Sequence, residues 1–369
     1  MSVASTVDPD LVETPVGVVD LDRARANAER VVAYASAHDL GWRPHIKTHK
    51  SRTLARLQLD AGARGLTVAT LREAEVMAAL TDDILLAYPP VGDAKLARLV
   101  ELPGSLDLKV ALDSTEVLEP LAAACRAAGR TVGVLVEQDV GMGRVGVQTE
   151  EAVVQLARRA AELGGVDFRG ILFYPGHIRM QQGGQGQPIT GVADRLARTL
   201  EALQAATLEP SIVSGGSTPT LWRSHEMPGL TEIRSGSCIY FDREALDVGV
   251  ARQEDLAYTV LATVVSTSVP GHAVVDAGSK ALARESRGAA DGFGILLDRP
   301  HVVVSSVSEE HGVLDLSQTD WRPRIGERVH IVPNHVCVSV NLQDRVLARD
   351  ARGYRPVEIE ARGRARTGG

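Results

Sequence analysis

The feature that most limits the fold of this sequence is a repeated alternation between short apolar runs and helix-like segments. Strand-like runs occupy residues 16–21, 42–46, 65–69, 83–87, 108–112, 131–136, 168–173, 211–213 and 232–234. Helix-like patterns, most of them about ten residues or longer, separate these runs about eight times. Such an alternation favours a parallel sheet, and an α/β fold built on a closed (β/α)8 TIM-type barrel is the simplest solution.

The alternation stops near residue 251. The strand-like runs 258–266, 273–276, 301–305, 312–316, 328–332, 336–340 and 346–348 then follow one another with Gly, Pro and Asp between them. Few helical patterns remain in this part, so it predicts a mostly-β C-terminal domain. We expect a barrel domain over residues 14–248 and a β domain over residues 249–361. Residues 1–13 are expected to belong with the β domain.

The composition excludes several classes of protein. Hydrophobic residues make up 44% and charged residues 24% of the 369 residues, as in an ordinary globular enzyme. A net charge of -7 and the lack of a long Lys/Arg run argue against nucleic-acid binding. The sequence has no signal-peptide pattern, no apolar stretch of the length that spans a membrane, and three widely spaced cysteines. We therefore expect a cytoplasmic protein with small-molecule ligands.

Lys47 is the first candidate for chemistry, because it follows the strand-like run 42–46. The carboxyl ends of barrel strands are where such barrels place catalytic residues. A lysine amine has an ordinary pKa of about 10.4, but a pocket that removes it from water makes it an amine that can form an imine. The alternative interpretation is a surface turn with scattered basic residues, among them His45 and His49.

Four glycine-bearing stretches follow other predicted strands. They occupy residues 141–144, 174–177, 214–218 and 234–237. The glycines and hydroxyls of the last two can present N–H and O–H groups to a phosphate, and anion binding after the last two strands is recurrent in barrels. Each stretch by itself is explained as well by a plain turn. Together with Lys47 they indicate a phosphorylated cofactor bound as an imine.

Several motifs, in order along nearly the whole chain, carry a resemblance to a known family. They are residues 14–15, 43–50, 139–146, 214–217, 234–237, 276–280, 308–312 and 333–337. The chain resembles the alanine-racemase-like (fold type III) pyridoxal-phosphate enzymes, and most closely their D-threonine aldolase and D-serine dehydratase branch.

The resemblance implies roles for the matched residues. Lys47 is expected to hold the aldehyde of pyridoxal 5'-phosphate and later to move the α-proton. Arg144 is expected near the phenolic oxygen of the cofactor and Arg234 near its ring nitrogen. Turn residues without a role are the alternative for the remaining expected cofactor-binding residues, which are Tyr174, Ser214, Gly216, Ser217, Gly236 and Ser237.

His335 and Cys337 are the predicted metal ligands. Two residues apart on a predicted strand, they would present their side chains on the same face. Imidazole and thiolate favour zinc over magnesium, and two protein ligands leave coordination positions open. By itself such a pair is more often half-buried than metal-binding. The resemblance places a metal-binding pair here, with zinc or manganese expected and magnesium possible in principle.

The resemblance implies a metal-activated lyase that acts on D-configured β-hydroxy-α-amino acids. His177 lies close to a histidine that the aldolases use near the substrate hydroxyl, which favours retro-aldol cleavage to glycine and an aldehyde. Cys337 instead favours the dehydratases, which give a 2-keto acid and ammonia, although Val338, Ser339 and Gln343 depart from the dehydratase pattern. An amino-acid racemase and a non-catalytic cofactor-binding protein remain as alternatives. The resemblance also implies a homodimer.

Overall fold

The computed structural model of the protein describes residues 6–286 and 291–364, and the chain divides into two compact units. The barrel unit consists of Glu29–Lys47, Leu54–Gly236 and the chain from Ala361 onward. The β unit consists of the chain up to Ala28, Thr48–Thr53 and Ser237–Glu360. The chain therefore changes unit directly after Lys47 and again directly after Gly236.

The barrel unit is built on an eight-stranded parallel sheet with the order β2-β9-β8-β7-β6-β5-β4-β3. The strands are β2 (Gly41–Trp42), β3 (Leu66–Val68), β4 (Asp83–Leu86), β5 (Asp107–Leu112), β6 (Val132–Gln138), β7 (Val166–Phe173), β8 (Ile212–Gly215) and β9 (Glu232–Ile233). The two ends of this order meet at a parallel bridge between His45 and Thr67, where Thr67 N donates to Pro44 O at 2.9 Å. The predicted TIM-type α/β fold is confirmed.

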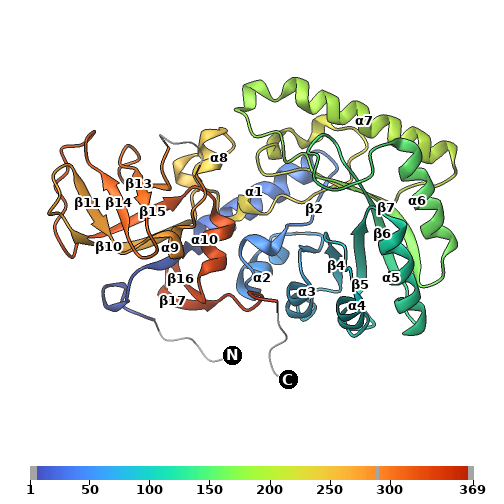
Figure 1. The fold of residues 1–369 in the computed structure, drawn as a ribbon, viewed down its shortest axis with the longest axis horizontal. Coiled ribbons are helices and arrows are strands. Elements are labelled where there is room, and N and C mark those ends of the chain that lie inside the picture. Colours follow the sequence, from blue (N-terminus) through green and yellow to red (C-terminus); the bar gives the residue numbers. More distant parts are fainter. Residues whose placement is uncertain (1–5, 287–290, 365–369) are drawn as a thin grey trace. The chain divides into compact units, whose positions relative to one another are not determined.

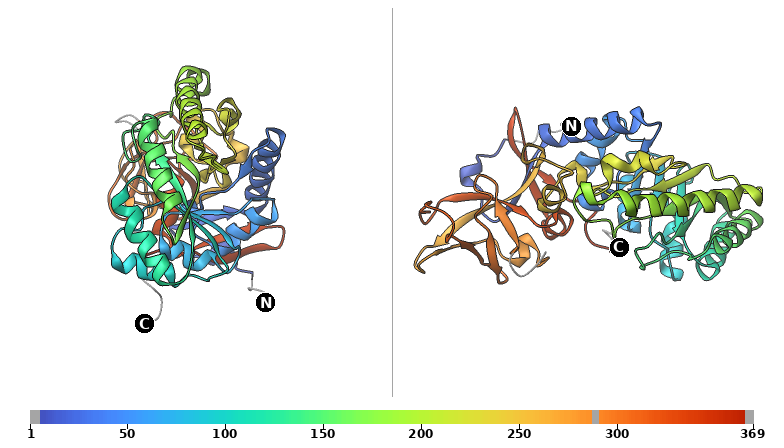
Figure 2. Two further views of the ribbon diagram at one scale, coloured as in Figure 1. Left: turned by 90° about the vertical axis from the view of Figure 1, so that its right-hand side faces the viewer. Right: turned by 90° about the horizontal axis from the view of Figure 1, so that it is seen from above.

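Helices follow the strands and lie on the outside of the sheet (Figures 1 and 2). They are α1 (Leu21–Ala37), α2 (Arg52–Asp60), α3 (Leu71–Met77), α4 (Asp93–Val100), α5 (Thr115–Ala127), α6 (Glu150–Glu162) and α7 (Gly186–Ala205). All seven residues of β6 are buried, because helices cover one face of the strand and the barrel interior covers the other. This explains why residues 132–136 of β6 form a continuous apolar run rather than an alternating one. None of the helices in the described part of the chain is long and apolar enough to cross a membrane.

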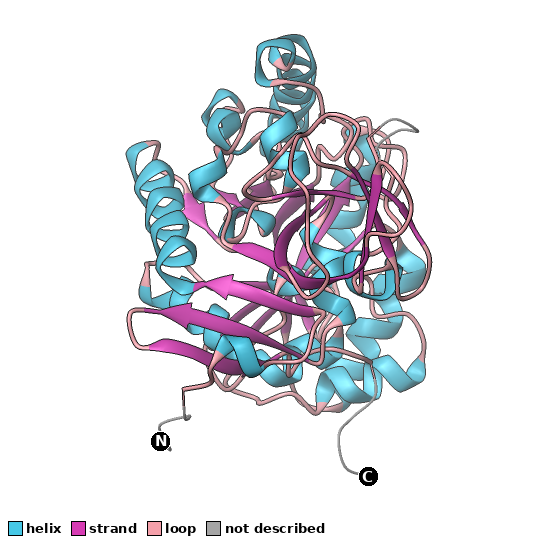
Figure 3. Ribbon diagram, turned by 90° about the vertical axis from the view of Figure 1, so that its left-hand side faces the viewer, coloured by secondary structure: helices cyan, strands magenta, loops and turns pink. Residues whose placement is uncertain are grey.

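The β unit contains a nine-stranded sheet (Figure 3). Its strands are β1 (Val16–Asp20), β10 (Tyr258–Ser266), β11 (His272–Val275), β12 (Gly294–Leu296), β13 (Val304–Val307), β14 (Gly312–Asp315), β15 (Arg328–Pro333), β16 (Arg345–Asp350) and β17 (Gly353–Glu358). Three short helices accompany them, α8 (Arg243–Asp247), α9 (Ser279–Leu282) and α10 (Val336–Leu342). The predicted mostly-β C-terminal part is confirmed.

The first strand-like run of the sequence belongs to this sheet rather than to the barrel. β1 pairs antiparallel with β10 and parallel with β16. Further toward the N-terminus, Val7 forms an isolated bridge with Tyr354 of β17. Residues 1–5 of the predicted N-terminal contribution lie outside the described residues. The domain boundaries at residues 14, 248 and 361 stay a prediction.

Two predicted strands are wrong in detail. Residues 336–340 form helix α10, in which Val336, Ser339 and Val340 are the buried residues. These positions have the i, i+3, i+4 spacing of one helix face, and burial of that face outweighs the strand preference of the valines. The run 42–46 is a strand only at Gly41–Trp42, and Ile46–Thr48 forms a 3-10 turn, η2.

Gly170 allows β7 and β8 to pair closely. Gly170 has a φ of 151°. The pairing of β7 with β6 is irregular just before it, because Val134 pairs with Phe168 and the next residue, Leu135, pairs with Gly170. A Cβ atom on Gly170 would lie 1.8 Å from the carbonyl oxygen of Ile212 in β8. An alanine at this position therefore requires backbone movement.

We predict that Gly170→Ala lowers the free energy of unfolding by about 3 kcal/mol, because the added methyl group overpacks the β7–β8 pairing. Denaturant unfolding followed by circular dichroism measures this effect. Gly183→Ala is the matched control, since its Cβ would meet nothing within 4 Å. Equal stability of the two variants would contradict the assignment of a steric role to Gly170.

Candidate active site

The residues predicted to bind the cofactor within the barrel unit follow the carboxyl ends of its parallel strands. Lys47 follows β2, Arg144 follows β6, and Tyr174 follows β7 directly. Ser214 lies in the last half of β8, and Arg234 follows β9 directly. Because the strands are parallel, these positions share one end of the barrel, the end that carries the active site in this architecture.

The turn that carries Lys47 is anchored on both sides. Ile46 and Thr48 are buried, whereas Lys47 between them is exposed. Upstream, the buried Trp42 indole Nε1–H donates to Ser235 O at 2.9 Å, which ties the segment to the loop after β9. The backbone of Lys47 is thus fixed while its amine is accessible, as covalent attachment of an aldehyde requires.

A buried ion network lies next to this segment. Arg43 Nε donates to both carboxylate oxygens of Glu232 at 2.9 and 3.0 Å, and its terminal nitrogens donate to Asp83. Arg43 and Glu232 are 2% and 0% exposed. Lys109 Nζ donates to the same Asp83 carboxylate at 2.6 Å. The two basic groups hold the pKa of Asp83 below its usual value even though burial acts to raise it.

Arg234 continues this network toward the strand ends. Its guanidinium donates to Ser214 Oγ at 2.9 Å and to Phe173 O at 2.8 Å, and Ser214 Oγ donates to Glu232 at 2.7 Å. Burial lowers the pKa of Arg234 to about 10, and Glu137 and Glu232 oppose this shift. Arg234 therefore remains a cation at neutral pH. The hydroxyl of Ser214 already links two charged groups, so its predicted part in phosphate binding stays a prediction.

Glu137 is a buried carboxyl group at the end of β6 that sequence reasoning did not select. Burial raises its pKa, although the charges of Arg234 and Arg144 act in the opposite direction. The only feature of the sequence that could have indicated it is a charged residue within an otherwise apolar run.

The segment after β8 has the composition of an anion cradle. Gly216 has a φ of 81°, and Ser217 is 2% exposed. Ser217 Oγ lies 3.0 Å from Thr220 Oγ1, and Ser235 Oγ donates to Ser217 O at 2.9 Å. Buried hydroxyls and a left-handed glycine that turns backbone N–H groups to one side are the donors that bind phosphate. The residues present therefore fit the phosphate of pyridoxal phosphate.

Asp139 organises the loop after β6. One carboxylate oxygen accepts hydrogen bonds from the amides of Gly141, Met142 and Gly143 at 3.2, 2.9 and 3.1 Å. Burial acts to raise the pKa of Asp139, but these amides outweigh it and the pKa is lowered. The loop gives Arg144 and His177 their positions. The Arg144 guanidinium carbon lies 5.2 Å from the centre of the Tyr174 ring.

His177 is exposed and lies against the same loop, since a Cβ on Gly141 would be 3.2 Å from its Cε1 and Nε2 atoms. Its imidazole is therefore accessible and held beside a loop of fixed conformation. Both properties suit a group that exchanges a proton with a small substrate.

The predicted metal ligands lie in the β unit, as do Thr48 and Ser237. His335 is the N-cap residue of α10 and Cys337 its second helical residue, so the pair does not sit on a strand. The two side chains are nevertheless neighbours, and the Cys337 charge, with Asp242, raises the pKa of His335 to about 12 against the effect of burial.

The donor set around this pair fits a metal ion with open positions. Among the residues that the structure describes, no group of three or more His, Cys, Asp and Glu side chains could hold a metal. A metal held by His335 and Cys337 would have two protein ligands and would leave the other positions to water or substrate. The Tyr240 hydroxyl is also fully buried without a hydrogen-bond partner in the described structure, and burial, with the charges of Tyr258 and Cys337, raises its pKa. A buried hydroxyl without a protein partner has room for a bond to a bound water or ion.

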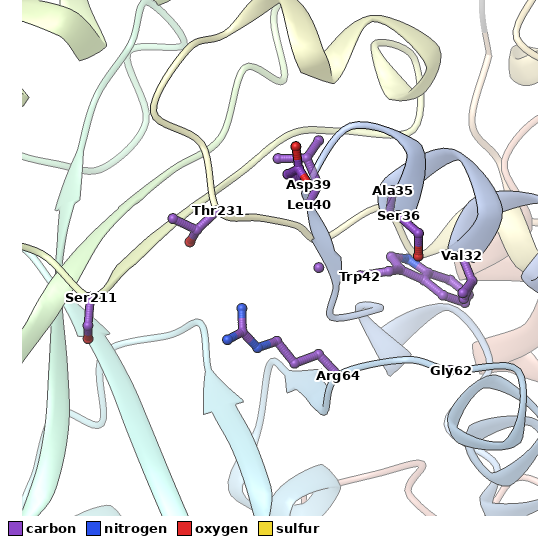
Figure 4. A pocket seen from close by; sticks show the side chains of 11 residues that line it. Val32, Ala35, Ser36, Asp39, Leu40, Trp42, Gly62, Arg64, Ser211 and Thr231 are labelled. Atoms are coloured by element: carbon purple, nitrogen blue, oxygen red, sulfur yellow. The ribbon is translucent and has the colours of Figure 1, made fainter.

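A cavity of about 580 Å³ lies at the other end of the barrel. Its lining includes Gly41, Ser211 and Thr231, which lie at or just before the amino ends of β2, β8 and β9. Figure 4 shows the Arg64 side chain extending into it. The strand direction therefore separates this cavity from the predicted cofactor residues by the length of the barrel, and we do not assign the chemistry to it.

Two family descriptions match the chain. "Alanine racemase, N-terminal domain" matches residues 19–244, and "Putative serine dehydratase domain" matches residues 257–348. The first match covers more than half of the 369 residues. The chain belongs to the alanine-racemase-like family. The predicted resemblance to fold type III pyridoxal-phosphate enzymes of the D-threonine aldolase and D-serine dehydratase branch is confirmed.

Relatives and solved structures in this family are similar to the chain over most of its length. D-threo-3-hydroxyaspartate dehydratase of Delftia sp. (strain HT23) is 35% identical over 351 residues, 89% of this chain and 91% of that protein. The crystal structure of D-threonine aldolase from Filomicrobium marinum has a TM-score of 0.90 at 30% identity, covering 97% of this chain and 98% of that one. The structure of a cysteine-to-alanine mutant of D-threo-3-hydroxyaspartate dehydratase, in a metal-free form, has a TM-score of 0.85 at 31% identity. The match covers 96% of this chain and 99% of that one.

We predict that Glu232→Gln in this racemase-like barrel lowers the free energy of unfolding by about 3–5 kcal/mol, because it leaves the Arg43 charge buried with less compensation. Denaturant unfolding at pH 7 measures the change. Glu119→Gln is the matched control, since Glu119 pairs with Arg159 at 2.7 Å but both side chains are about half exposed, at 52% and 42%. The control should change stability by less than about 1 kcal/mol. A loss at Glu232 no larger than at Glu119 would show that the buried pair is dispensable.

Proposed function

We propose that this member of the alanine-racemase-like family is a metal-activated, pyridoxal-phosphate-dependent lyase. Its substrates would be D-configured β-hydroxy-α-amino acids, and its products glycine and an aldehyde. The observation that carries the proposal is the exposed Lys47 amine at the same barrel end as the buried hydroxyl cradle around Gly216 and Ser217. Family membership and the likeness to a D-threonine aldolase structure support the reaction class.

Different residues of the barrel would bind different parts of the cofactor. Ser217, Gly216 and Gly236, with Ser237 and Ser214, would hold the phosphate, and Lys47 would hold the aldehyde until a substrate amine replaces it. Arg234 would face the cofactor ring and Arg144, beside Tyr174, its phenolic oxygen. When bound, pyridoxal phosphate supplies a conjugated ring that withdraws electrons from the substrate Cα.

His335 and Cys337 would hold a divalent ion, with zinc favoured by the thiolate and imidazole donors and manganese or magnesium as alternatives. The ion would supply a Lewis acid for the substrate β-hydroxyl. The imidazole–thiolate pair of this chain and the metal-free form described for a cysteine mutant of a relative support metal binding.

The fate of the substrate depends on which group removes a proton first. If His177 accepts the β-hydroxyl proton, the electrons of the Cα–Cβ bond pass to Cα, and an aldehyde leaves. Lys47 can then return a proton to Cα. All atoms of D-threonine are thereby recovered in one glycine and one acetaldehyde. The exposed imidazole of His177 favours this course.

Dehydration is the second candidate. If Lys47 removes the α-proton first, the β-hydroxyl departs as water, and hydrolysis of the resulting enamine gives a 2-keto acid and ammonia. Cys337, the match of residues 257–348 to a putative serine dehydratase domain, and the Delftia relative favour this course. The two reactions share a substrate class and differ in their products.

We also propose that the enzyme acts as a homodimer in the cytoplasm, with a barrel domain over residues 14–248 and a β domain over 249–361. Cys125, Cys238 and Cys337 are not in disulfide bonds, which suits a reducing compartment.

The first prediction of this proposal concerns Lys47. Borohydride reduction of the cofactor-loaded protein followed by peptide mapping should place the cofactor on Lys47. Lys47→Ala should abolish the label and reduce turnover by about 10³-fold or more, because the covalent nucleophile is lost. Lys50→Gln is the control, since Lys50 is a neighbouring lysine whose Nζ donates to Asn341 at 2.7 Å, and it should keep the label on Lys47. A label on any other lysine would overturn the assignment.

The second prediction concerns the products. D-threonine, D-serine and 3-hydroxy-D-aspartate, each supplied with zinc or manganese, should yield glycine and an aldehyde, and a chelator should stop the reaction. His177→Asn should lower glycine formation by about 10²-fold, the usual contribution of a general base. Chromatography of amino acids and keto acids measures both. Pyruvate and ammonia from D-serine without glycine from D-threonine would instead establish the dehydratase.

A further inference from the structure

The predicted metal ligands of the β unit each have a buried hydrogen-bonding partner that nothing above assigns to the site. Asp242 is 2% exposed and lies at the N-terminus of α8. Thr48 is 1% exposed and follows Lys47 in the chain. Both belong to the same compact unit as His335 and Cys337.

Asp242 contacts the His335 ring and two backbone amides. Its Oδ2 lies 3.1 Å from His335 Nδ1 and accepts the amide hydrogen of Val336 at 3.0 Å, and its Oδ1 accepts the amide hydrogen of Ala245 at 3.1 Å. A carboxylate only accepts hydrogen bonds, so the hydrogen between it and the ring sits on Nδ1. The lone pair for a metal is then on Nε2. The bond to the Val336 amide also fixes the ring to the first turn of α10.

Glu244 places a second carboxylate oxygen 3.7 Å from the same Nδ1. The Nδ1 side of the ring thus faces two carboxylates, which reinforces the Nδ1–H tautomer. Carboxylate–histidine–metal chains of this kind orient the ligand and raise its basicity.

Thr48 Oγ1 lies 3.2 Å from Cys337 Sγ. A thiolate can only accept, so the Thr48 hydroxyl donates to the sulfur once Cys337 is deprotonated. Hydrogen bonds to a ligating sulfur settle its orientation and its charge.

We propose that Asp242 and Thr48 are the positioning residues of the metal pair, Asp242 for His335 and Thr48 for Cys337. The inference rests on the proposed function, because it requires that the pair binds a divalent ion. Neither residue touches the metal. Each sets the direction in which one ligand presents its lone pair.

Metal affinity measured apart from turnover tests the inference. Co²⁺ titration of the cofactor-loaded, metal-depleted protein, followed by the thiolate-to-cobalt absorption and by equilibrium dialysis, gives the dissociation constant. Asp242→Ser keeps an N-cap oxygen for Ala245 but is too short for His335, and it should weaken Co²⁺ binding by about 10–100-fold. Thr48→Val should weaken binding by about 10-fold, and Thr48→Ser should restore it.

Asp255→Ser is the matched control for Asp242→Ser. Asp255 lies in the same unit and its carboxylate accepts the Arg252 amide hydrogen at 2.8 Å, so it loses a cap of the same kind without a metal ligand. Co²⁺ affinity should be unchanged in this variant. Asp242→Asn, which keeps the side-chain shape, repeats the test if thermal unfolding shows that Asp242→Ser is not folded.

Two further variants separate this inference from the proposed function. His335→Ala and Cys337→Ala should abolish tight Co²⁺ binding. If they leave it unchanged, the metal pair itself is wrong, and the proposed function loses its metal. If they abolish it while Asp242→Ser, Asp242→Asn and Thr48→Val bind Co²⁺ like the unaltered protein, the positioning roles are refuted and the metal pair stands.

Discussion

The Arg43 guanidinium joins the barrel where its sheet closes. Its partners, Glu232 on β9 and Asp83 on β4, flank β2 and β3, the two strands at which the ends of the sheet meet. A buried charge without partners costs several kcal/mol, so the chain can bury Arg43 only when both strands are in place. Glu232 also accepts from Ser214, which accepts from Arg234. The interaction that closes the barrel therefore also positions the arginine proposed to face the cofactor ring.

The sequence predicted the barrel because parallel strands buried on both faces leave long apolar runs between amphipathic helices. It did not show which runs pair with each other. Nine such runs precede residue 251, and the barrel uses eight, because β1 pairs with β10 and β16 through contacts more than 200 residues away. The prediction of a strand over residues 336–340, where α10 lies, is wrong for a related reason. The preference of valine for strands is local, whereas the burial of Val336, Ser339 and Val340 depends on the tertiary packing around them.

In the candidate site, too, the sequence indicates residues within short motifs but not the contacts between residues far apart in the chain. Lys47, Arg144, Arg234, His335 and Cys337 stand in short motifs that a resemblance can match. The contacts proposed to hold these residues in place cannot be read from a motif. Asp242 lies 93 residues from His335, and Thr48 lies 289 residues from Cys337. No periodicity or spacing in the sequence connects such pairs, and only the folded β unit brings them within hydrogen-bonding distance.

Thr48 follows Lys47 in the chain and contacts the proposed metal ligand Cys337. A lysine that first holds an aldehyde and then moves a proton needs a mobile amine on a fixed backbone, and its four-carbon stem supplies the mobility. The backbone is fixed by buried residues on both sides, and the hydroxyl of the one on the C-terminal side, Thr48, lies 3.2 Å from the sulfur of the proposed metal ligand Cys337. A change in the charge or position of the sulfur therefore acts on Thr48, one residue from the amine. With the proposed roles of Lys47 and Cys337, cofactor attachment and metal binding would be linked through the backbone of a single turn.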